Sequence, residues 1–302
     1  MFTEILVPLD GSKLSERVLP YVKSLAEGLK IPIELLAVVD PDMLIAPAVE
    51  SESYQKAFFA DRKKIAQHYL KNIAGILASG FHAEQFVVVG KPAETIVKHA
   101  AMNPKALVAM GTHGRSGVER WVLGSVADEV LHSTKNPVLL VRTTEEPPKN
   151  TGAFKSVIVP LDGSALAETV LPVVAELYRT MKLEVILMRI WEIPVLYYDE
   201  GYALEEHIVK AIEDESRNYV DRKVIDLKRQ GVGNVKGVIV QGFPAESIID
   251  LAAKTPNAFI AMCTHGRSGV RRWILGSVTE RLVRHSGDPV LVIRPADFKP
   301  AV

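Results

Sequence analysis

Two glycine-containing segments hold the residues of this chain that are best suited to bind a phosphate. One reads PLDGS from Pro8 to Ser12, and the other runs from Gly111 to Ser125 as GTHGRSGVERWVLGS. Glycine lets a backbone approach a ligand closely because it has no Cβ. Unpaired N–H groups and the positive end of the helix dipole attract anions where a helix begins. The second segment therefore predicts a phosphate-binding loop that leads into a helix near Ser125.

Backbone amides can supply most of the affinity that such a loop needs. A hydrogen bond to a charged group contributes about 1.5–3 kcal/mol, so three or four of them approach the roughly −8 kcal/mol of a micromolar complex. The segment differs from the common phosphate loops. The residue directly before Ser125 is not the lysine that a P-loop requires, and the GxGxxG spacing of a dinucleotide-binding loop is absent. Ser116 also lacks the GxSxG context of a nucleophile elbow. The sequence therefore predicts binding without fast hydrolysis.

The chain repeats itself along its whole length. VPLDGS begins at Val7 and again 152 positions later at Val159. THGRSGVERWVLGSV, from Thr112, returns as THGRSGVRRWILGSV from Thr264, with 13 of 15 positions identical. Solenoid repeats are about 20–50 residues long, so a period of this length is a whole domain. We predict one domain over residues 1–143, a linker with a proline pair over 144–153, and a second domain over 154–302.

Apolar runs alternate with helical periodicity inside each copy. In the first copy, strands are expected at 4–8, 33–39, 84–89, 106–110 and 137–141, and helices within 14–29, 54–78, after Pro92 and over 125–133. The second copy repeats the strands near 156–160, 183–190, 236–240, 258–262 and 289–293. Nearly continuous apolar strands indicate a sheet that is covered on both faces. The alternation predicts an α/β fold with a mostly parallel, doubly wound sheet in each copy.

In open sheets of this kind, ligands bind past the carboxyl ends of the strands, where the strand order reverses. The two glycine-containing segments follow the first and the fourth strand of the first copy. They face each other across one crevice if these two strands are neighbours, which we assume at this point.

Composition limits the classes of partner. The 302 residues include 36 basic and 36 acidic side chains, so the formal net charge is zero and offers no overall field for nucleic acid or an anionic membrane. A single cysteine, Cys263, excludes an internal disulfide and fits a reducing compartment. No secretory signal is visible, and the apolar runs are too short to cross a bilayer. We expect a cytoplasmic protein that binds neither nucleic acid nor membrane.

The glycine spacing resembles that of a known family. Gly111, Gly114, Gly124 and Ser125 fit the pattern G-x2-G-x9-G-S. Together with the doubled VPLDGS opening, this pattern makes the chain similar to a tandem member of the universal stress protein family, and the similarity covers both copies. The resemblance implies a five-stranded sheet of order 3-2-1-4-5. It also implies the ATP-binding branch of the family, with ATP, alone or with Mg²⁺, lying across the ends of strands one and four.

Residue roles follow from this resemblance. It implies that Asp10 faces the ribose or a magnesium-linked phosphate, that the backbone of Val38 meets adenine, and that Gly111 lies against the ribose. The set of binding residues implied for the first copy is Pro8, Leu9, Asp10, Ser12, Val38, Gly111, His113, Gly114, Arg115, Gly124, Ser125 and Val126. The matching set in the second copy is Asp162, Ile190, Gly266, Arg267, Gly276, Ser277 and Val278. No metal ligand is assigned.

The second copy departs from the family pattern at Cys263, which stands where the motif has its first glycine. A Cβ and a sulfur at a position of close approach would push the sugar away. We therefore predict that the first copy binds nucleotide better than the second.

Some of these residues also have a purely structural interpretation. Ser12 or Asp10 could cap the helix that follows. Ser277 with Glu280 fits a capping box, and Ser125 with Asp128 nearly does. A cap and a phosphate compete for the same N–H groups, so both interpretations stay open at this stage.

Three functions are compatible with the sequence. The leading hypothesis is an ATP-binding stress-response regulator with at most slow hydrolysis. A slow ATPase or adenylating enzyme is the second, although the SGGxDS and HIGH motifs are absent. A pseudo-dimeric scaffold or sensor of a non-nucleotide ligand is the third. We expect the two copies to pair within the chain through their last strands, which the family order places at sheet edges. Whether two chains form a homodimer is left open.

Overall fold

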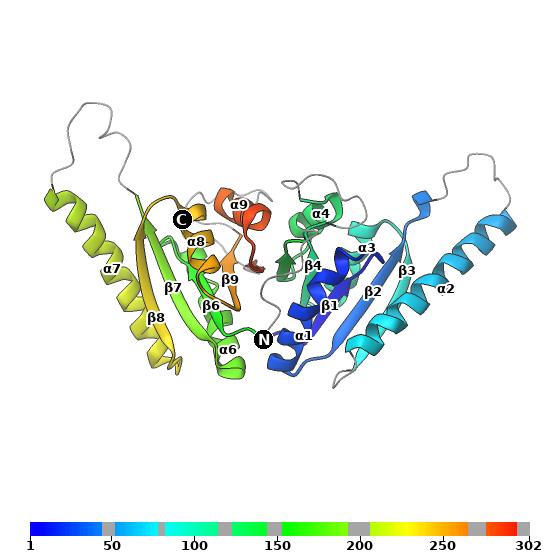
Figure 1. Cartoon of the computed structure of the whole chain (residues 1–302), viewed down its shortest axis with the longest axis horizontal. Helices are drawn as coiled ribbons and strands as arrows, with labels where there is room; N and C mark the ends of the chain where they lie inside the picture. The colour runs from blue at the N-terminus through cyan, green and yellow to red at the C-terminus, as the bar shows by residue number, and fades with distance from the viewer. Residues whose placement is uncertain are drawn as a thin grey trace, which may run out of the picture. The chain divides into compact units, whose positions relative to one another are not determined.

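The computed structural model describes residues 1–43, 52–77, 82–113, 123–143, 153–192, 206–264 and 276–294. The chain divides into two compact units, unit 1 over Met1–Ala153 and unit 2 over Phe154–Val302. Figure 1 labels their helices and strands. None of the described helices is long and apolar enough to cross a bilayer.

Unit 1 alternates strands and helices along the chain. Its elements are β1 (Glu4–Pro8), the 3-10 helix η1 (Ser15–Val18), α1 (Leu19–Leu29), β2 (Ile33–Val39), the 3-10 helix η2 (Pro41–Met43), α2 (Glu52–Leu77), β3 (Ala83–Val89), α3 (Pro92–Met102), β4 (Ala106–Gly111), α4 (Ser125–Ser133) and β5 (Val138–Val141). The described strands pair in parallel in the order β3-β2-β1-β4-β5. The predicted α/β class and strand order are confirmed.

Unit 2 repeats this plan. Its elements are β6 (Ser156–Pro160), α5 (Ala165–Glu168), α6 (Leu171–Met181), β7 (Glu184–Trp191), α7 (Glu206–Arg229), β8 (Val235–Gln241), α8 (Pro244–Ala253), β9 (Ala258–Cys263), α9 (Ser277–His285) and β10 (Val290–Ile293). Taken by itself, its sheet has the order β8-β7-β6-β9-β10, again with parallel pairs. The family order 3-2-1-4-5 therefore occurs in both units.

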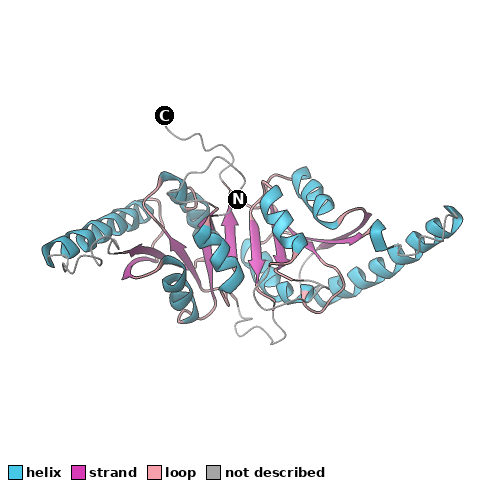
Figure 2. Cartoon of the chain, turned by 90° about the horizontal axis from the view of Figure 1, so that it is seen from above, coloured by secondary structure: helices cyan, strands magenta, loops and turns pink. Residues whose placement is uncertain are grey.

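Helices cover both faces of each sheet, as Figure 2 shows. The inner strands are buried accordingly, and in β2 Ile33, Leu35 and Leu36 are at most 1% exposed, whereas β3 and β8 are largely exposed or half-buried. This explains the continuous apolar runs of the sequence, because a strand covered on both faces has no side that must be polar.

The first helical segment differs from its prediction. The periodicity from residue 14 to 29 predicts one helix, whereas the chain forms η1 and then α1, with Pro20 in the first turn of α1. Proline has no N–H to donate to the preceding turn, and this favours a new helix start at that point.

Candidate functional site

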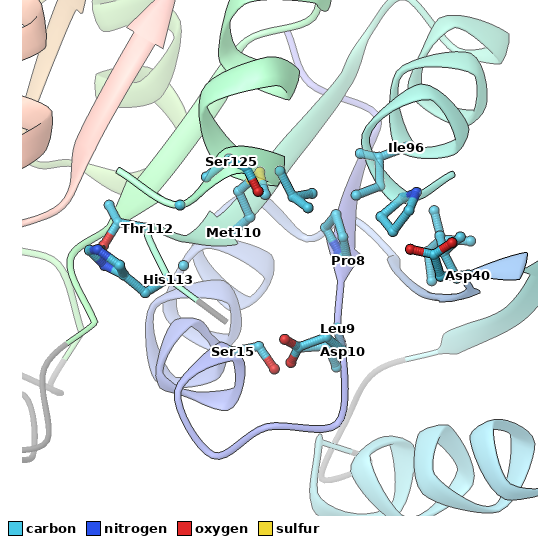
Figure 3. Close-up of a pocket in the computed structure, with 17 residues that line it drawn as sticks. Pro8, Leu9, Asp10, Ser15, Asp40, Ile96, Met110, Thr112, His113 and Ser125 are labelled. Carbon is cyan, nitrogen blue, oxygen red and sulfur yellow. The ribbon is translucent and has the colours of Figure 1, made fainter. Parts of the chain in front are cut away.

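Parallel pairing of β1 with β4 brings the two glycine-containing segments together. Leu6 of β1 lies opposite Val108 of β4, so the assumption that these strands are neighbours is confirmed. The loops that follow them border a cavity of about 260 Å³ at the carboxyl edge of the unit 1 sheet (Figure 3). The residues that line it are Pro8, Leu9, Asp10, Ser15, Leu36, Val38, Asp40, Pro92, Ile96, Met110, Gly111, Thr112, His113, Gly124, Ser125, Val126 and Ala127.

Asp10 is held in one orientation by the turn that follows β1. Its Oδ1 accepts hydrogen bonds from Ser12 N at 2.9 Å and from Ser12 Oγ at 2.7 Å. Gly11 has φ +83° in this turn, a conformation that residues with a side chain rarely adopt. Ser12 Oγ accepts a hydrogen bond from Ser15 N at 3.1 Å, so Ser12 also caps the turn that becomes η1. The carboxylate of Asp10 is thereby fixed at the edge of the cavity.

Gly124 lies against the backbone of Thr112 where the β4 loop enters α4. Gly124 N donates to Thr112 O at 2.8 Å. A Cβ at position 124 would lie 2.9 Å from that same oxygen, which is closer than Cβ atoms come in proteins. The close approach of two backbone segments therefore requires glycine here.

The first turn of α4 carries no side-chain cap. Its N-cap is Gly124, and the N-cap of α9 is Gly276, with no side-chain hydrogen bond at either position. The expected caps by Ser125 with Asp128 and by Ser277 with Glu280 are therefore wrong, because each serine is already the first helical residue. Consequently the N-cap residue leaves the first N–H groups of α4 without a side-chain partner, and the residues that carry them border the cavity.

A network of threonine hydroxyls holds the start of the β4 loop. Thr143 Oγ1 accepts from His113 N at 3.0 Å and donates to His113 O at 3.3 Å, and Thr143 N donates to Thr112 Oγ1 at 3.2 Å. His113 Nδ1 lies 3.0 Å from Thr112 Oγ1. The buried Nε2 of His113 has no hydrogen-bond partner within the described residues. The imidazole is thus oriented through one nitrogen, Nδ1, by the neighbouring threonine.

β1 ends before β2 does, and this leaves the main chain of Val38 unused. Leu9 N donates to Leu36 O at 2.9 Å, whereas Gly90 N donates to Val39 O at 3.1 Å. Alternate residues of a parallel strand address opposite neighbours, so the N–H and C=O of Val38 face the β1 side. The chain turns away there at Gly11, and in the described part of the chain no backbone hydrogen bond joins the β1 loop to Val38. Val38 therefore presents one donor and one acceptor.

The two sides of the cavity differ in chemistry. Figure 3 shows Asp40 and Ile96 on one side and Thr112 and His113 on the opposite side, with Pro8 between them. Part of the cavity wall is apolar, because Leu36, Ile96 and Met110 contribute to it. Such a wall suits a flat, uncharged ring, whereas the side near α4 suits an anion.

Unit 2 has a corresponding cavity of about 280 Å³. Asp162 Oδ1 accepts from Ser164 N at 2.9 Å and from Ser164 Oγ at 2.6 Å, and Gly163 has φ +86°. The residues that line it are Pro160, Leu161, Asp162, Ala167, Ile190, Pro244, Ile248, Met262, Cys263, Gly276, Ser277, Val278 and Thr279. The backbone turn at the aspartate is therefore the same in both units.

Cys263 lines this second cavity without making it smaller than the first. Its Sγ lies 3.5 Å from Thr169 Oγ1, which donates to Leu166 O at 2.6 Å. The thiol therefore contacts the segment between α5 and α6. The volumes of the second and first cavities are about 280 and about 260 Å³, respectively. The weaker nucleotide affinity of unit 2 stays a prediction.

Tyr219 of α7 is tied to the segment that follows the Asp162 turn. Glu168 accepts hydrogen bonds from Tyr219 OH at 2.8 Å and from Lys223 Nζ at 2.7 Å. Burial, together with the hydrogen bond to Glu168, raises the pKa of Tyr219 well above its ordinary value near 10. The hydroxyl therefore stays protonated and donating at neutral pH.

A further cavity, of about 260 Å³, lies at the opposite, amino edge of the unit 1 sheet. Its wall includes Glu4, Glu34 and Glu84 of three neighbouring strands, and His99 of α3. His99 Nε2 and Glu34 Oε1 are 2.5 Å apart, and their side chains are only 8% and 15% exposed. Within the described ranges no three His, Cys, Asp or Glu residues are grouped as metal ligands.

Most of the predicted site residues that the structure describes lie around the two cavities. In unit 1 these are Pro8, Leu9, Asp10, Val38, Gly111, His113, Gly124, Ser125 and Val126, and in unit 2 they are Asp162, Ile190, Gly276, Ser277 and Val278. Ser12 contacts Asp10 and is not a lining residue. Gly114, Arg115, Gly266 and Arg267 lie outside the described residues.

Sequence reasoning missed several residues of the wall. Leu36 and Asp40 flank Val38 at spacings of two in β2 and just beyond it, so they share its face of the sheet. Pro92 and Ile96 come from the first turns of α3. Met110 and Thr112 lie directly before and after Gly111, so they are two residues apart from each other. The period of two was available in the sequence, but only the strand order shows which face lines the cavity.

Two similar α/β domains in one chain, each with a cavity at the carboxyl edge beside the strand-order reversal, define a class of tandem Rossmann-like proteins. The model of the universal stress protein family matches residues 1–142 and 153–294. The chain therefore belongs to the universal stress protein family, as a member with two family domains.

Individual relatives agree with this assignment. A universal stress protein of Mycobacterium tuberculosis is 25% identical over 315 residues, covering 99% of this chain and 96% of the relative. A universal stress protein of Bacillus subtilis is 30% identical over 148 residues, which are 47% of this chain and all of the relative. The crystal structure of a universal stress protein from Archaeoglobus fulgidus covers 97% of this chain and 98% of its own, with a TM-score of 0.69 and 23% identity, and so supports the fold.

Proposed function

We propose that unit 1 binds an adenine nucleotide, ATP or a close relative, and that the protein is a stress-response regulator with at most slow hydrolysis. One observation supports this more than any other. The unused donor and acceptor of Val38 and the uncapped first turn of α4 border the same cavity. These two features suit the two ends of a nucleotide, the base and the phosphates.

The main chain of Val38 suits adenine in particular. Adenine carries an acceptor, N1, beside a donor, the amino group on C6, whereas guanine carries a donor N1–H beside the acceptor O6. The N–H of Val38 would therefore donate to N1, and its C=O would accept from the amino group. The apolar wall of Leu36, Ile96 and Met110 would pack against the ring.

The opposite side of the cavity would take the phosphates. The backbone N–H groups of Ser125 and Val126 lie at the positive end of the α4 dipole, whereas the N–H of Gly124 is bonded to Thr112 O. His113 Nε2, which has no partner in the described part of the chain, would donate to a phosphate oxygen. Asp10 would meet a ribose hydroxyl or an Mg²⁺ ion that arrives with the triphosphate, because Mg²⁺ binds through carboxylates and phosphates while it keeps several waters.

The same residues support slow rather than fast turnover. The described residues that line the cavity include no lysine or arginine to stabilise charge on a transferring phosphoryl group. Oδ1 of Asp10, the carboxylate on this loop, is committed to Ser12. Tight binding with little chemistry is therefore expected.

The test uses the full chain. Purified protein is denatured, and adenine nucleotide is sought in the supernatant by chromatography. Protein freed of nucleotide is then titrated with ATP by calorimetry, and phosphate release is followed for hours. We expect an affinity near micromolar or tighter and turnover far below the roughly 1–10³ per second of typical enzymes. Rapid turnover would favour the enzyme hypothesis, and absence of both nucleotide and titratable binding would favour the scaffold hypothesis.

Two further parts of the proposal concern the two-domain chain. We propose that unit 1 binds nucleotide better than unit 2, and that the two family domains pair within the chain. Support for pairing comes from β5 and β10, each the last strand of its own unit's order. Light scattering of the full chain will show whether a homodimer forms in addition.

A further inference from the structure

Asp40 lies on the cavity side of β2, two residues beyond Val38. Leu36, Val38 and Asp40 follow one another at spacings of two and all line the unit 1 cavity. Side chains at this spacing share one face of a strand. Asp40 is half-buried, and Figure 3 places it on the side of the cavity away from His113. It is therefore a charged group at the side that the base would occupy.

The carboxylate of Asp40 is held by the main chain that follows it. Asp42 N donates to Asp40 Oδ1 at 2.9 Å. Within the described residues, Asp40 has no ion pair and its other oxygen has no hydrogen bond. An ionised carboxylate is only an acceptor. Asp40 thus offers one oriented acceptor oxygen at the cavity that Val38 also lines.

We propose that Asp40 determines which purine the site accepts, by taking a hydrogen from the amino group on C6 of adenine. The inference rests on the proposed nucleotide site of unit 1 and names the residue that selects the base there. The amino group carries two hydrogens, and each acceptor takes one, the C=O of Val38 and the carboxylate of Asp40.

A purine with oxygen at C6 would bind less favourably beside these two acceptors, the C=O of Val38 and the carboxylate of Asp40. Hypoxanthine and guanine place the acceptor O6 where adenine places its amino group. O6 would then face two acceptors, and a buried acceptor without a donor loses the full cost of its desolvation. A site built to hydrogen-bond one group rejects an analogue that lacks it far more strongly than an apolar pocket does.

Unit 2 lacks this feature at the equivalent position. The residue 152 positions further on is Glu192, whose side chain is exposed and is absent from the described wall of the second cavity. Among its described residues, unit 2 therefore offers no carboxylate in its cavity wall that corresponds to Asp40.

Asp40→Asn gives a direct test, because asparagine has the same shape. The amide keeps an oxygen to accept from Asp42 N, and it turns the other oxygen into an NH₂ donor. The NH₂ group opposes the amino group of adenine and pairs with O6. The full chain, freed of nucleotide, is titrated with ATP and with inosine triphosphate, which has oxygen at C6. Asp42→Asn is the matched control, since it removes the same charge two residues away on an exposed side chain.

We expect the native chain and Asp42→Asn to prefer ATP, and Asp40→Asn to lower the ratio of ATP to inosine triphosphate affinity by about tenfold or more. An unchanged ratio in Asp40→Asn, with ATP still bound, overturns the role of Asp40 and leaves the proposed function intact. A native chain that binds inosine triphosphate as well as ATP also overturns it. Failure of the native chain to bind either nucleotide rejects the proposed function itself. Circular dichroism of each variant shows that it is folded.

Discussion

Thr143 and His113 are joined by two hydrogen bonds across the carboxyl edge of unit 1, from His113 N to Thr143 Oγ1 at 3.0 Å and from Thr143 Oγ1 to His113 O at 3.3 Å. The methyl group of the same threonine lies 2.7 Å from where a Cβ on Gly111 would be. One side chain therefore holds the start of the β4 loop and also excludes a side chain from position 111.

This arrangement predicts a coupling between positions 111 and 143. Gly111→Ala is expected to destabilise unit 1 by about 1–3 kcal/mol, because the new Cβ overpacks against Thr143. Thr143→Ser keeps the hydroxyl and removes the methyl group, so the double variant should regain most of this loss. Urea unfolding with a double-mutant cycle measures the coupling. Additive effects of the two substitutions would show that the methyl group is not the obstacle.

Gly124→Ala is expected to lower the affinity for ATP at least tenfold. The Cβ would lie 2.9 Å from Thr112 O and would displace the loop from the first turn of α4. Calorimetric titration of the full chain measures the change.

Two controls accompany this variant. Gly75→Ala adds a Cβ with nothing within 4 Å, inside α2, and should leave affinity unchanged while it stabilises the helix by about 0.5–1 kcal/mol. Gly276→Ala changes the position of unit 2 that corresponds to Gly124. It should lower the affinity of the tighter nucleotide site less than Gly124→Ala does. An equal effect of Gly276→Ala would contradict the dominance of unit 1.

The buried pair of Glu34 and His99 has an apolar counterpart in unit 2, where Ile186 and Leu251 stand 152 positions further on. His99→Leu alone should destabilise unit 1 by about 3–5 kcal/mol, since it leaves a nearly buried carboxylate without its partner. The double variant Glu34→Ile, His99→Leu should be far less destabilised, or more stable than the native chain. Urea unfolding of the native chain and the two variants measures this, and a double variant that is less stable than His99→Leu would refute the expectation.

The raised pKa of Tyr219 predicts a dependence of stability on alkaline pH. Below pH of about 10, tyrosine is neutral in both the folded and the unfolded chain, so its contribution is constant. Above that pH the unfolded tyrosine ionises while burial and Glu168 keep the folded one neutral. Stability should therefore fall as pH rises past 10.

Tyr219→Phe removes the ionisable hydroxyl and should make this alkaline loss smaller, at the cost of the bond to Glu168 at neutral pH. The free energy of unfolding from urea titrations between pH 8 and about 11 measures the effect. Identical slopes for the native chain and Tyr219→Phe would show that another group is responsible.

The sequence predicts the fold well because its inner strands, such as β1 and β4, are buried on both faces and several of its helices carry regular apolar spacing. The repeat also lets each strand of the fold be predicted twice, once in each copy, from Glu4 in β1 to Ile293 in β10. The glycine-containing segments also mark the two loops whose described residues border the cavity. The capping pattern at Ser125 and Ser277 fails, because a pattern of residue types does not show whether a serine stands before the helix or begins it.

Other features of the site depend on the residue at which each strand ends, and the residue types in the sequence do not predict that position. Val38 has an unused main chain because β1 ends near Pro8, and Asp40 lines the cavity because it continues the face of Val38. The direction of the Cys263 thiol, toward Thr169, likewise follows from packing between segments that are far apart in sequence.

The donor and acceptor at the end of β2 belong to the peptide backbone, so a change of side chain at that position leaves both in place, except that proline would remove the N–H. Valine at 38 and isoleucine at 190 differ in sequence, and within the described residues no backbone hydrogen bond to the preceding strand's loop uses their N–H and C=O groups. Random mutagenesis of this codon would therefore be largely silent for the proposed base recognition, whereas lengthening the β1 loop by one or two residues would not. Natural drift at such a site hides its importance from any method that scores residue identity alone.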